Sequence, residues 1–125
     1  MDKKNILVVE DEAPLRDVLK SKLEEEGFSV STAVNGVEGL MAVQKEKPDL
    51  ILLDILMPIM DGVTMLKELR IYEENRNIPV IVLTNLFDEK KVTECMEKGV
   101  YDYLVKIDWK IEDVVTLVKS KLETK

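Results

Sequence analysis

Four of the short apolar runs in this sequence end in a side chain suited to the chemistry of phosphate or of a metal ion. Glu10 and Asp11 follow the first run, Asp54 follows the third, Thr84 the fourth and Lys106 the fifth. Helix capping or solvation at the end of an element explains any one of them alone. If the first and third runs are neighbouring strands, however, three carboxylates meet at the rim of an apolar core. They repel one another there unless a cation offsets their charge.

The residue types narrow the choice of that cation and of the reaction. The sequence contains no histidine, and a site built from oxygen donors alone favours a hard ion. Mg²⁺ suits a small, open cluster because it takes one or two carboxylates and keeps waters or phosphate oxygens as its other ligands. We therefore expect Glu10 and Asp11 to hold Mg²⁺ and Asp54 to accept a phosphoryl group as an aspartyl phosphate. Lys106 and the Thr84 hydroxyl would stabilise the phosphoryl oxygens.

The elements that must position these residues alternate along the chain. Short apolar runs are separated by longer stretches with apolar residues at helical spacing, which is typical of βα units around a mainly parallel sheet. The second run alternates polar and apolar residues, so we predict it at an edge of the sheet. A fourth helix is expected around Cys95 and a fifth around residues 111–122. The predicted strands cover residues 6–9, 29–33, 50–53, 80–83 and 101–105.

The expected fold class is α/β, a doubly wound, five-stranded parallel sheet with helices on both faces. Right-handed crossovers favour this closure, and we expect the flavodoxin-like strand order 2-1-3-4-5, although the sequence does not itself determine the order. In such a sheet ligands bind outside the carboxyl ends of the strands, where the polar residues above lie. No Pro- or Gly-rich boundary interrupts the chain, so residues 1–125 are expected to form one domain.

The composition limits the surroundings and the partners of the chain. A net charge of −7 repels phosphate backbones and anionic lipid, so we expect neither direct nucleic-acid binding nor membrane association. We see no export signal and no apolar run of membrane-spanning length, and the single cysteine suits a reducing compartment. A cytoplasmic location is therefore expected.

Four stretches of the sequence resemble the receiver domains of two-component response regulators, over about residues 6–122. The stretches are ILVVEDE at 6–12, DILMPIMDG at 54–62, VIVLT at 80–84 and YLVK at 103–106, and the second is the most specific. The resemblance implies that Asp54 is phosphorylated. It implies Mg²⁺ ligation by Asp11, Glu10, Asp54 and the Leu56 backbone carbonyl. It further implies that Thr84 and Tyr103 form a switch pair that repacks the face of helix four, strand five and helix five.

Two positions depart from the family pattern and leave an alternative open. Asn85 stands where a small residue is usual, and Ile107 stands where the family commonly has a proline. Both flank the expected site, so the serious alternative is a receiver-like interaction module that works without phosphorylation. A haloacid-dehalogenase-like phosphatase would need an acid in place of Leu56. A flavodoxin-like flavin binder would need a Ser/Thr/Gly-rich phosphate loop after the first strand, so both are less favoured.

The resemblance also implies partners. Because the chain has no histidine, the expected donor is a histidine kinase, a phosphotransfer protein or a small acyl phosphate. The expected output is contact with a downstream protein through the face of helix four, strand five and helix five. The chain is expected to be a monomer or a phosphorylation-linked dimer. Since it would catalyse only its own phosphorylation and dephosphorylation, we do not class it as an enzyme.

Overall fold

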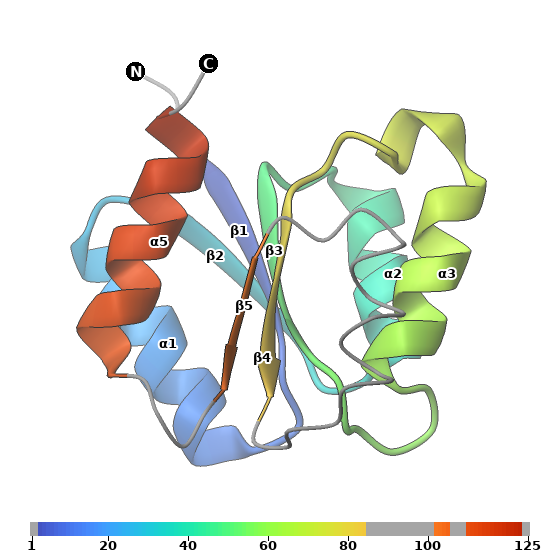
Figure 1. Ribbon diagram of the computed structural model, residues 1–125, viewed down its shortest axis with the longest axis horizontal. Coiled ribbons are helices and arrows are strands. Elements are labelled where there is room, and N and C mark those ends of the chain that lie inside the picture. Colours follow the sequence, from blue (N-terminus) through green and yellow to red (C-terminus); the bar gives the residue numbers. More distant parts are fainter. Residues whose placement is uncertain (1–2, 85–101, 106–109, 124–125) are drawn as a thin grey trace.

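Strands and helices alternate along the chain in this computed structural model (Figure 1). The structure describes residues 3–84, 102–105 and 110–123, and at residues 84 and 102–105 it describes the backbone alone. The strands are β1 (Asn5–Val9), β2 (Ser29–Ala33), β3 (Leu50–Asp54), β4 (Val80–Thr84) and β5 (Asp102–Val105). The helices are α1 (Ala13–Glu25), α2 (Gly36–Lys45), α3 (Gly62–Ile71), the short 3-10 helix η1 (Glu73–Asn75) and α5 (Ile111–Glu123). The fourth helix predicted around Cys95 lies outside the described residues.

The five strands form one parallel sheet in the order β2-β1-β3-β4-β5. This confirms the predicted α/β fold class and the predicted strand order. It also confirms β2 as an edge strand, and most of the β2 side chains are exposed. In contrast, β3 is buried along its whole length and β1 along all but its first residue, because their side chains are apolar on both faces.

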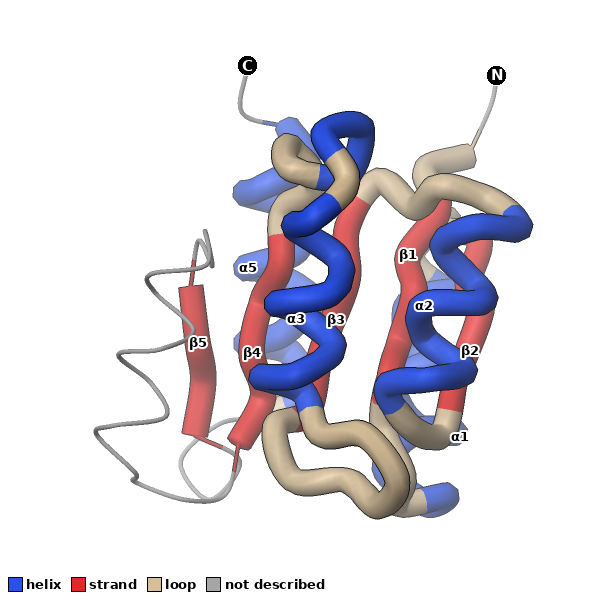
Figure 2. The backbone as a smooth tube through the Cα atoms, turned by 90° about the vertical axis from the view of Figure 1, so that its right-hand side faces the viewer, coloured by secondary structure: helices blue, strands red, loops and turns tan. Residues whose placement is uncertain are grey.

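Helices cover both faces of the sheet (Figures 1 and 2). Successive strand residues point to opposite faces, so Ile6 and Val8 pack in the core shared with α1 and α5, while Leu7 and Val9 pack with α2 and α3. The sheet therefore lies between two apolar cores. None of the helices that the structure describes is long and apolar enough to cross a membrane.

Local capping signals set where the helices begin and end. Gly27 has a φ of 97° just after α1, a left-handed conformation that glycine adopts without a Cβ penalty. At the start of α2, Asn35 Oδ1 accepts a hydrogen bond from the backbone nitrogen of Glu38 at 2.9 Å. At the start of α3, Asp61 Oδ1 accepts one from Thr64 at 2.8 Å. These caps fix two helix starts at the edge of the sheet where β1 and β3 end.

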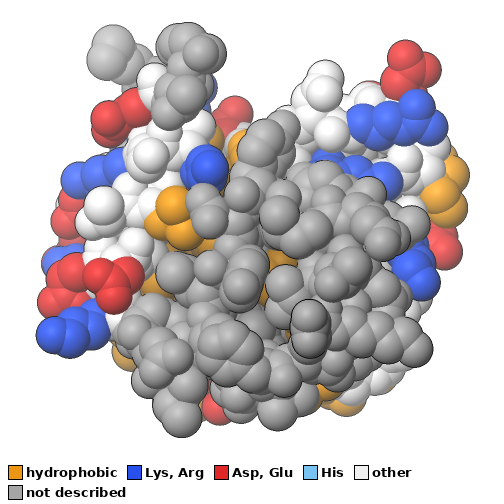
Figure 3. All heavy atoms as spheres, viewed as in Figure 1, with side chains coloured by type: hydrophobic (Ala, Val, Ile, Leu, Met, Phe, Trp, Pro, Cys, Tyr) orange, Lys and Arg blue, Asp and Glu red, His pale blue; other side chains and the backbone are white. Residues whose placement is uncertain are grey.

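An ion pair joins the two helices on one face of the sheet. Charged side chains of both signs lie along α5 at the left of Figure 3. One of them, Lys119 of α5, pairs through Nζ with Oε1 of Glu26, the C-cap residue of α1. The hydrogen bond from Lys119 and its positive charge lower the pKa of Glu26 below its ordinary value of 4.5.

The lowered pKa of Glu26 gives the ion pair a predictable pH dependence. Because the pKa is lower in the folded protein than in the unfolded chain, the pair stabilises the fold above pH 4.5, and this contribution is lost as the pH falls through the lowered pKa. We expect Lys119→Gln to lower the midpoint of urea unfolding slightly at neutral pH. The difference from the wild type should become smaller as the pH falls. Urea unfolding of both proteins over this pH range measures the difference. If the midpoint of the variant stays below that of the wild type by the same amount in acid, the ion pair is not the cause of the difference.

Candidate functional site

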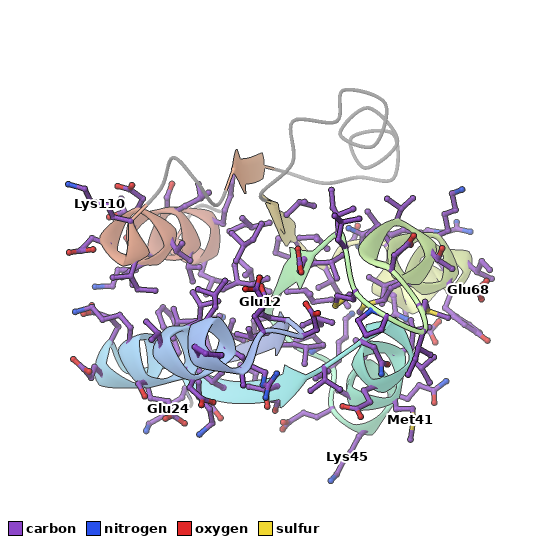
Figure 4. All side chains as sticks on the ribbon, turned by 90° about the horizontal axis from the view of Figure 1, so that it is seen from below. Glu12, Glu24, Met41, Lys45, Glu68 and Lys110 are labelled. Atoms are coloured by element: carbon purple, nitrogen blue, oxygen red, sulfur yellow. The ribbon has the colours of Figure 1, made fainter. Side chains whose placement is uncertain are left out.

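Three carboxylates meet at the carboxyl edge of the sheet. Ligand oxygens of Glu10, Asp11 and Asp54 all lie within 4.8 Å of one another. Glu10 directly follows β1 and Asp54 ends β3, and the parallel pairing of these strands brings both residues to the same edge. Glu10 and Asp54 are only 1% and 3% exposed, whereas Asp11 is exposed. Figure 4 views the molecule from this edge, with the neighbouring Glu12 labelled near the centre, where α1 begins.

The last strand residues differ slightly from those expected. Asp54 is the final residue of β3 rather than the first residue after it, because its backbone still pairs with Leu83 of β4. Thr84 ends β4 in the same way, since its backbone pairs with Val105 of β5, and Tyr103 of β5 pairs with Val82 of β4. The structure describes only the backbone of Thr84 and Tyr103, and Lys106 lies outside the described residues. Among the expected site residues, the structure thus brings together the three acids. The roles of all the expected site residues, these three included, stay predictions.

The turn between β1 and α1 is held from several sides. The Glu10 backbone nitrogen donates to the Ala33 carbonyl at 3.0 Å, and the Glu12 backbone nitrogen donates to Glu10 Oε2 at 3.1 Å. Arg16 Nη1 donates to the carbonyl oxygens of Glu10 at 2.9 Å and Asp11 at 3.3 Å. Arg16 was not among the residues predicted to form the site. Its only signal was a basic residue in the first turns of the helix after the acids, which is common on exposed helix faces.

The loop from residue 55 to residue 61 carries the chain from Asp54 to α3. Its far end is fixed to α2, because the Gly36 backbone nitrogen donates to the Met60 carbonyl at 2.9 Å. Leu56 lies in this loop two residues after Asp54, and its side chain is 42% exposed. An apolar side chain there is compatible with a backbone carbonyl ligand, and that use of Leu56 stays a prediction.

Ile59, in the same loop, has a strained backbone. Its φ is 71°, a left-handed conformation that β-branched residues rarely adopt, and its side chain is 83% exposed. We expect Ile59→Gly to raise the free energy of unfolding by roughly 0.5–1 kcal/mol, because relief of about 1–2 kcal/mol of strain exceeds the entropy gained by the unfolded chain. Urea unfolding measures this gain. The same substitution at Ile71, an exposed residue in α3, is the control and should destabilise, and an equal loss at both positions would contradict the prediction.

The three acids form a donor set suited to a hard divalent cation. All the side-chain donors are carboxylate oxygens, which suit Mg²⁺, Ca²⁺ or Mn²⁺ better than softer metals. Two are buried and one is exposed, so a cation there would keep an open side for water or an anionic ligand. Mg²⁺ binds in this manner, with few protein ligands and several waters. The residues therefore fit Mg²⁺, and a bound cation would offset the repulsion among three crowded carboxylates.

A comparison of the sequence with models of known protein families finds one match. The model of the response regulator receiver domain matches residues 6–119. The chain belongs to the response regulator receiver family. Its members are the receiver domains of two-component signalling systems. The resemblance stated from the sequence is thereby confirmed.

Individual proteins similar to this receiver domain include both curated relatives and solved structures. It is 42% identical over 106 residues to a "Probable transcriptional regulator ycf27" of Cyanophora paradoxa, covering 85% of this chain and 43% of the relative. It is 34% identical over 120 residues to the "DNA-binding response regulator MtrA" of Mycolicibacterium paratuberculosis, covering 96% and 52%. The signal receiver domain of a signal transduction histidine kinase from Syntrophus aciditrophicus superposes with a TM-score of 0.86 at 36% identity, covering 98% of this chain and 95% of that one.

The receiver domain spans about half the length of these two curated relatives. Their names refer to transcription and to DNA binding, and those words describe the longer proteins. The comparisons therefore give no support to the expectation that this chain avoids nucleic acid. That expectation stays a prediction from the net charge of −7.

Proposed function

We propose that this receiver domain accepts a phosphoryl group on Asp54 in a Mg²⁺-dependent reaction. The observation that carries the proposal is the convergence of the Glu10, Asp11 and Asp54 carboxylates within 4.8 Å, with Asp54 nearly buried at the end of a central strand. A carboxylate is a known phosphoryl acceptor, and catalysis of such a transfer consists mainly of positioning and charge stabilisation. A rigid strand end surrounded by metal-binding acids supplies both.

Each residue of the proposed site has a distinct part in the transfer. A carboxylate oxygen of Asp54 attacks the phosphorus; an O–P bond forms as the bond between phosphorus and the donor breaks, and the donor group leaves with that electron pair. Glu10, Asp11, Asp54 and the Leu56 carbonyl would hold Mg²⁺, which when bound neutralises charge on the phosphoryl oxygens. Lys106 and the Thr84 hydroxyl would donate to the remaining oxygens.

The same proposal covers the partners of the domain. Residues 1–125 would act as one receiver domain, phosphorylated by a histidine kinase or a phosphotransfer protein. The phosphoryl group would draw Thr84 inward and let the Tyr103 ring turn into the vacated space. This would repack the face of the fourth predicted helix, β5 and α5 for a downstream protein. A cytoplasmic location would give access to these partners.

Acetyl phosphate tests the proposal without a partner protein. Incubation with acetyl phosphate and Mg²⁺ is expected to add one phosphoryl group to the wild type, as read by intact mass. The gain should be absent in Asp54→Asn and strongly reduced with EDTA. Asp17→Asn, which removes an exposed carboxylate from α1, is the matched control and should be modified as the wild type is.

Two results would contradict the proposal. A wild type that stays unmodified would favour the interaction module that works without phosphorylation. Modification of Asp54→Asn to the same extent as the wild type would place the acceptor elsewhere in the chain.

A further inference from the structure

Arg16 is a basic side chain that donates hydrogen bonds to the acidic turn between β1 and α1. It lies in α1, is half-buried, and its Nη1 donates to two consecutive carbonyl oxygens, those of Glu10 at 2.9 Å and Asp11 at 3.3 Å. The Arg16 backbone nitrogen also donates to the Glu12 carbonyl at 2.9 Å. The side chain and backbone of one helical residue are thus bonded to three successive residues of the turn before the helix.

These contacts restrict the two residues whose carboxylates face Asp54. A guanidinium bonded to the carbonyls of Glu10 and Asp11 fixes the orientation of both peptide groups, and the orientation of a peptide group sets the direction of the side chains beside it. The Glu10 nitrogen is bonded to Ala33 of β2 at the same time, so the turn is held from the sheet and from the helix. Ordering the turn before binding spares the conformational entropy that metal binding would otherwise cost.

We infer that Arg16 is a positioning residue for the metal site of the proposed function: its hydrogen bonds to the Glu10 and Asp11 carbonyls aim these two carboxylates at Asp54. The inference rests on the proposed function. Residues that orient metal ligands in this way typically change metal affinity by 10–100-fold when they are removed.

The positive charge of Arg16 acts in the opposite direction to its hydrogen bonds. A cation near the acids weakens Mg²⁺ binding by repulsion, so loss of the charge alone would tighten binding. Loss of the two hydrogen bonds would weaken it. The sign of the change in affinity therefore distinguishes positioning from a general electrostatic effect.

Mg²⁺ titration calorimetry on the full chain tests the inference with matched variants. Arg16→Gln is expected to raise the Kd for Mg²⁺ roughly tenfold or more. Arg16→Lys keeps the charge and can reach fewer carbonyls, so its Kd should fall between those of the wild type and Arg16→Gln. Lys20→Gln removes a positive charge from the same helix, where Lys20 pairs with Glu24 at 3.3 Å on the surface, and should change the Kd by less than about twofold.

Urea unfolding in metal-free buffer accompanies each titration. A role limited to fold stability would lower the unfolding midpoint and leave the Kd of the folded protein unchanged. If Arg16→Gln does not fold, the test uses Arg16→Lys, whose Kd for Mg²⁺ is expected to be several-fold higher than that of the wild type.

Three results would overturn the inference. The first is an unchanged or lower Kd for Mg²⁺ in Arg16→Gln. The second, which applies if Arg16→Gln does not fold, is an unchanged Kd in Arg16→Lys. The third is a rise of the Kd in Lys20→Gln as large as that in Arg16→Gln. A wild type that binds no Mg²⁺ would instead overturn the proposed function, and the inference with it, so the two failures are distinguishable.

Discussion

Asp11→Asn is expected to lose most of its Mg²⁺ affinity and, at the same time, to become slightly more stable in metal-free buffer. Asp11 is the exposed member of the cluster, so an amide in its place creates no buried unsatisfied group. In the proposed site its carboxylate would be a direct ligand of the cation, so we expect its loss to raise the Kd for Mg²⁺ at least tenfold, or about 1.4 kcal/mol. Without metal, the change removes a negative charge that faces Glu10 and Asp54, a repulsion of up to roughly 1 kcal/mol for exposed charges.

The opposite signs of these two effects make the experiment selective. Urea unfolding with and without Mg²⁺ gives both values, because saturating metal stabilises a protein that binds it, by about 2.7 kcal/mol at a hundred times the Kd. The wild type should gain this stability, and at the same Mg²⁺ concentration Asp11→Asn, with a Kd at least tenfold higher, should gain about 1.4 kcal/mol or less. Asp17→Asn, on α1, changes the net charge of the protein by the same amount as Asp11→Asn. It should respond to Mg²⁺ as the wild type does. An Asp11→Asn protein with wild-type affinity would exclude the cluster as the Mg²⁺ site.

The sequence was most informative where a buried strand ends. Apolar residues on both faces of β1 and β3 predict central strands, and the alternation in β2 predicts an edge, as the sheet confirms. Central parallel strands carry whatever follows them to one edge, so the meeting of Glu10, Asp11 and Asp54 could be predicted without coordinates. The ends of β3 and β4 were both predicted one residue early, because Asp54 and Thr84 are polar and give no apolar signal although their backbones still pair.

Features that depend on the relative placement of separate elements could not be predicted. The bonds from Arg16 back to the turn depend on where α1 begins and on which way a flexible side chain folds. The left-handed backbone of Ile59 goes against the preference of its residue type, so its sequence signal is misleading. The hydrogen bond between Gly36 and Met60 joins the first residue of α2 to the loop after β3, and only the tertiary fold brings these two segments together.

Gly62, the first residue of α3, lies directly against the backbone of Asp54 and Ile55. Its backbone nitrogen donates to the Ile55 carbonyl at 2.8 Å. A Cβ built on Gly62 would overlap the Asp54 carbonyl oxygen and lie 2.9 Å from Ile55 Cα. Every one of these neighbours is backbone, so no side chain can rotate away to make room. Alanine at this position would therefore push apart α3 and the peptide that carries Asp54.

Gly62→Ala is accordingly expected to lower the free energy of unfolding by about 2–3 kcal/mol, in the range of overpacking substitutions. Helix propensity alone would favour alanine by about 1 kcal/mol, so the sign of the change tests the close approach itself. The control is Gly39→Ala in α2, whose Cβ would meet the flexible end of the Met65 side chain at 2.8 Å and Val9 Cγ2 at 3.2 Å, all of them side-chain atoms. Urea unfolding should show a large loss at Gly62 and a small change at Gly39.

A second measurement on Gly62→Ala connects the packing to the chemistry. Under conditions where the variant is fully folded, the displaced peptide should move Asp54 away from Glu10 and Asp11, and a misplacement of about 1 Å can cost on the order of a hundredfold in rate. We therefore expect slower modification by acetyl phosphate as well as lower stability. Gly39→Ala should react at the wild-type rate, since the nearest neighbours of its Cβ are side-chain atoms of Met65 and Val9 and not the Asp54 backbone. Equal rates and equal stability in the two variants would show that the contact between Gly62 and the Asp54 peptide does not position the acceptor.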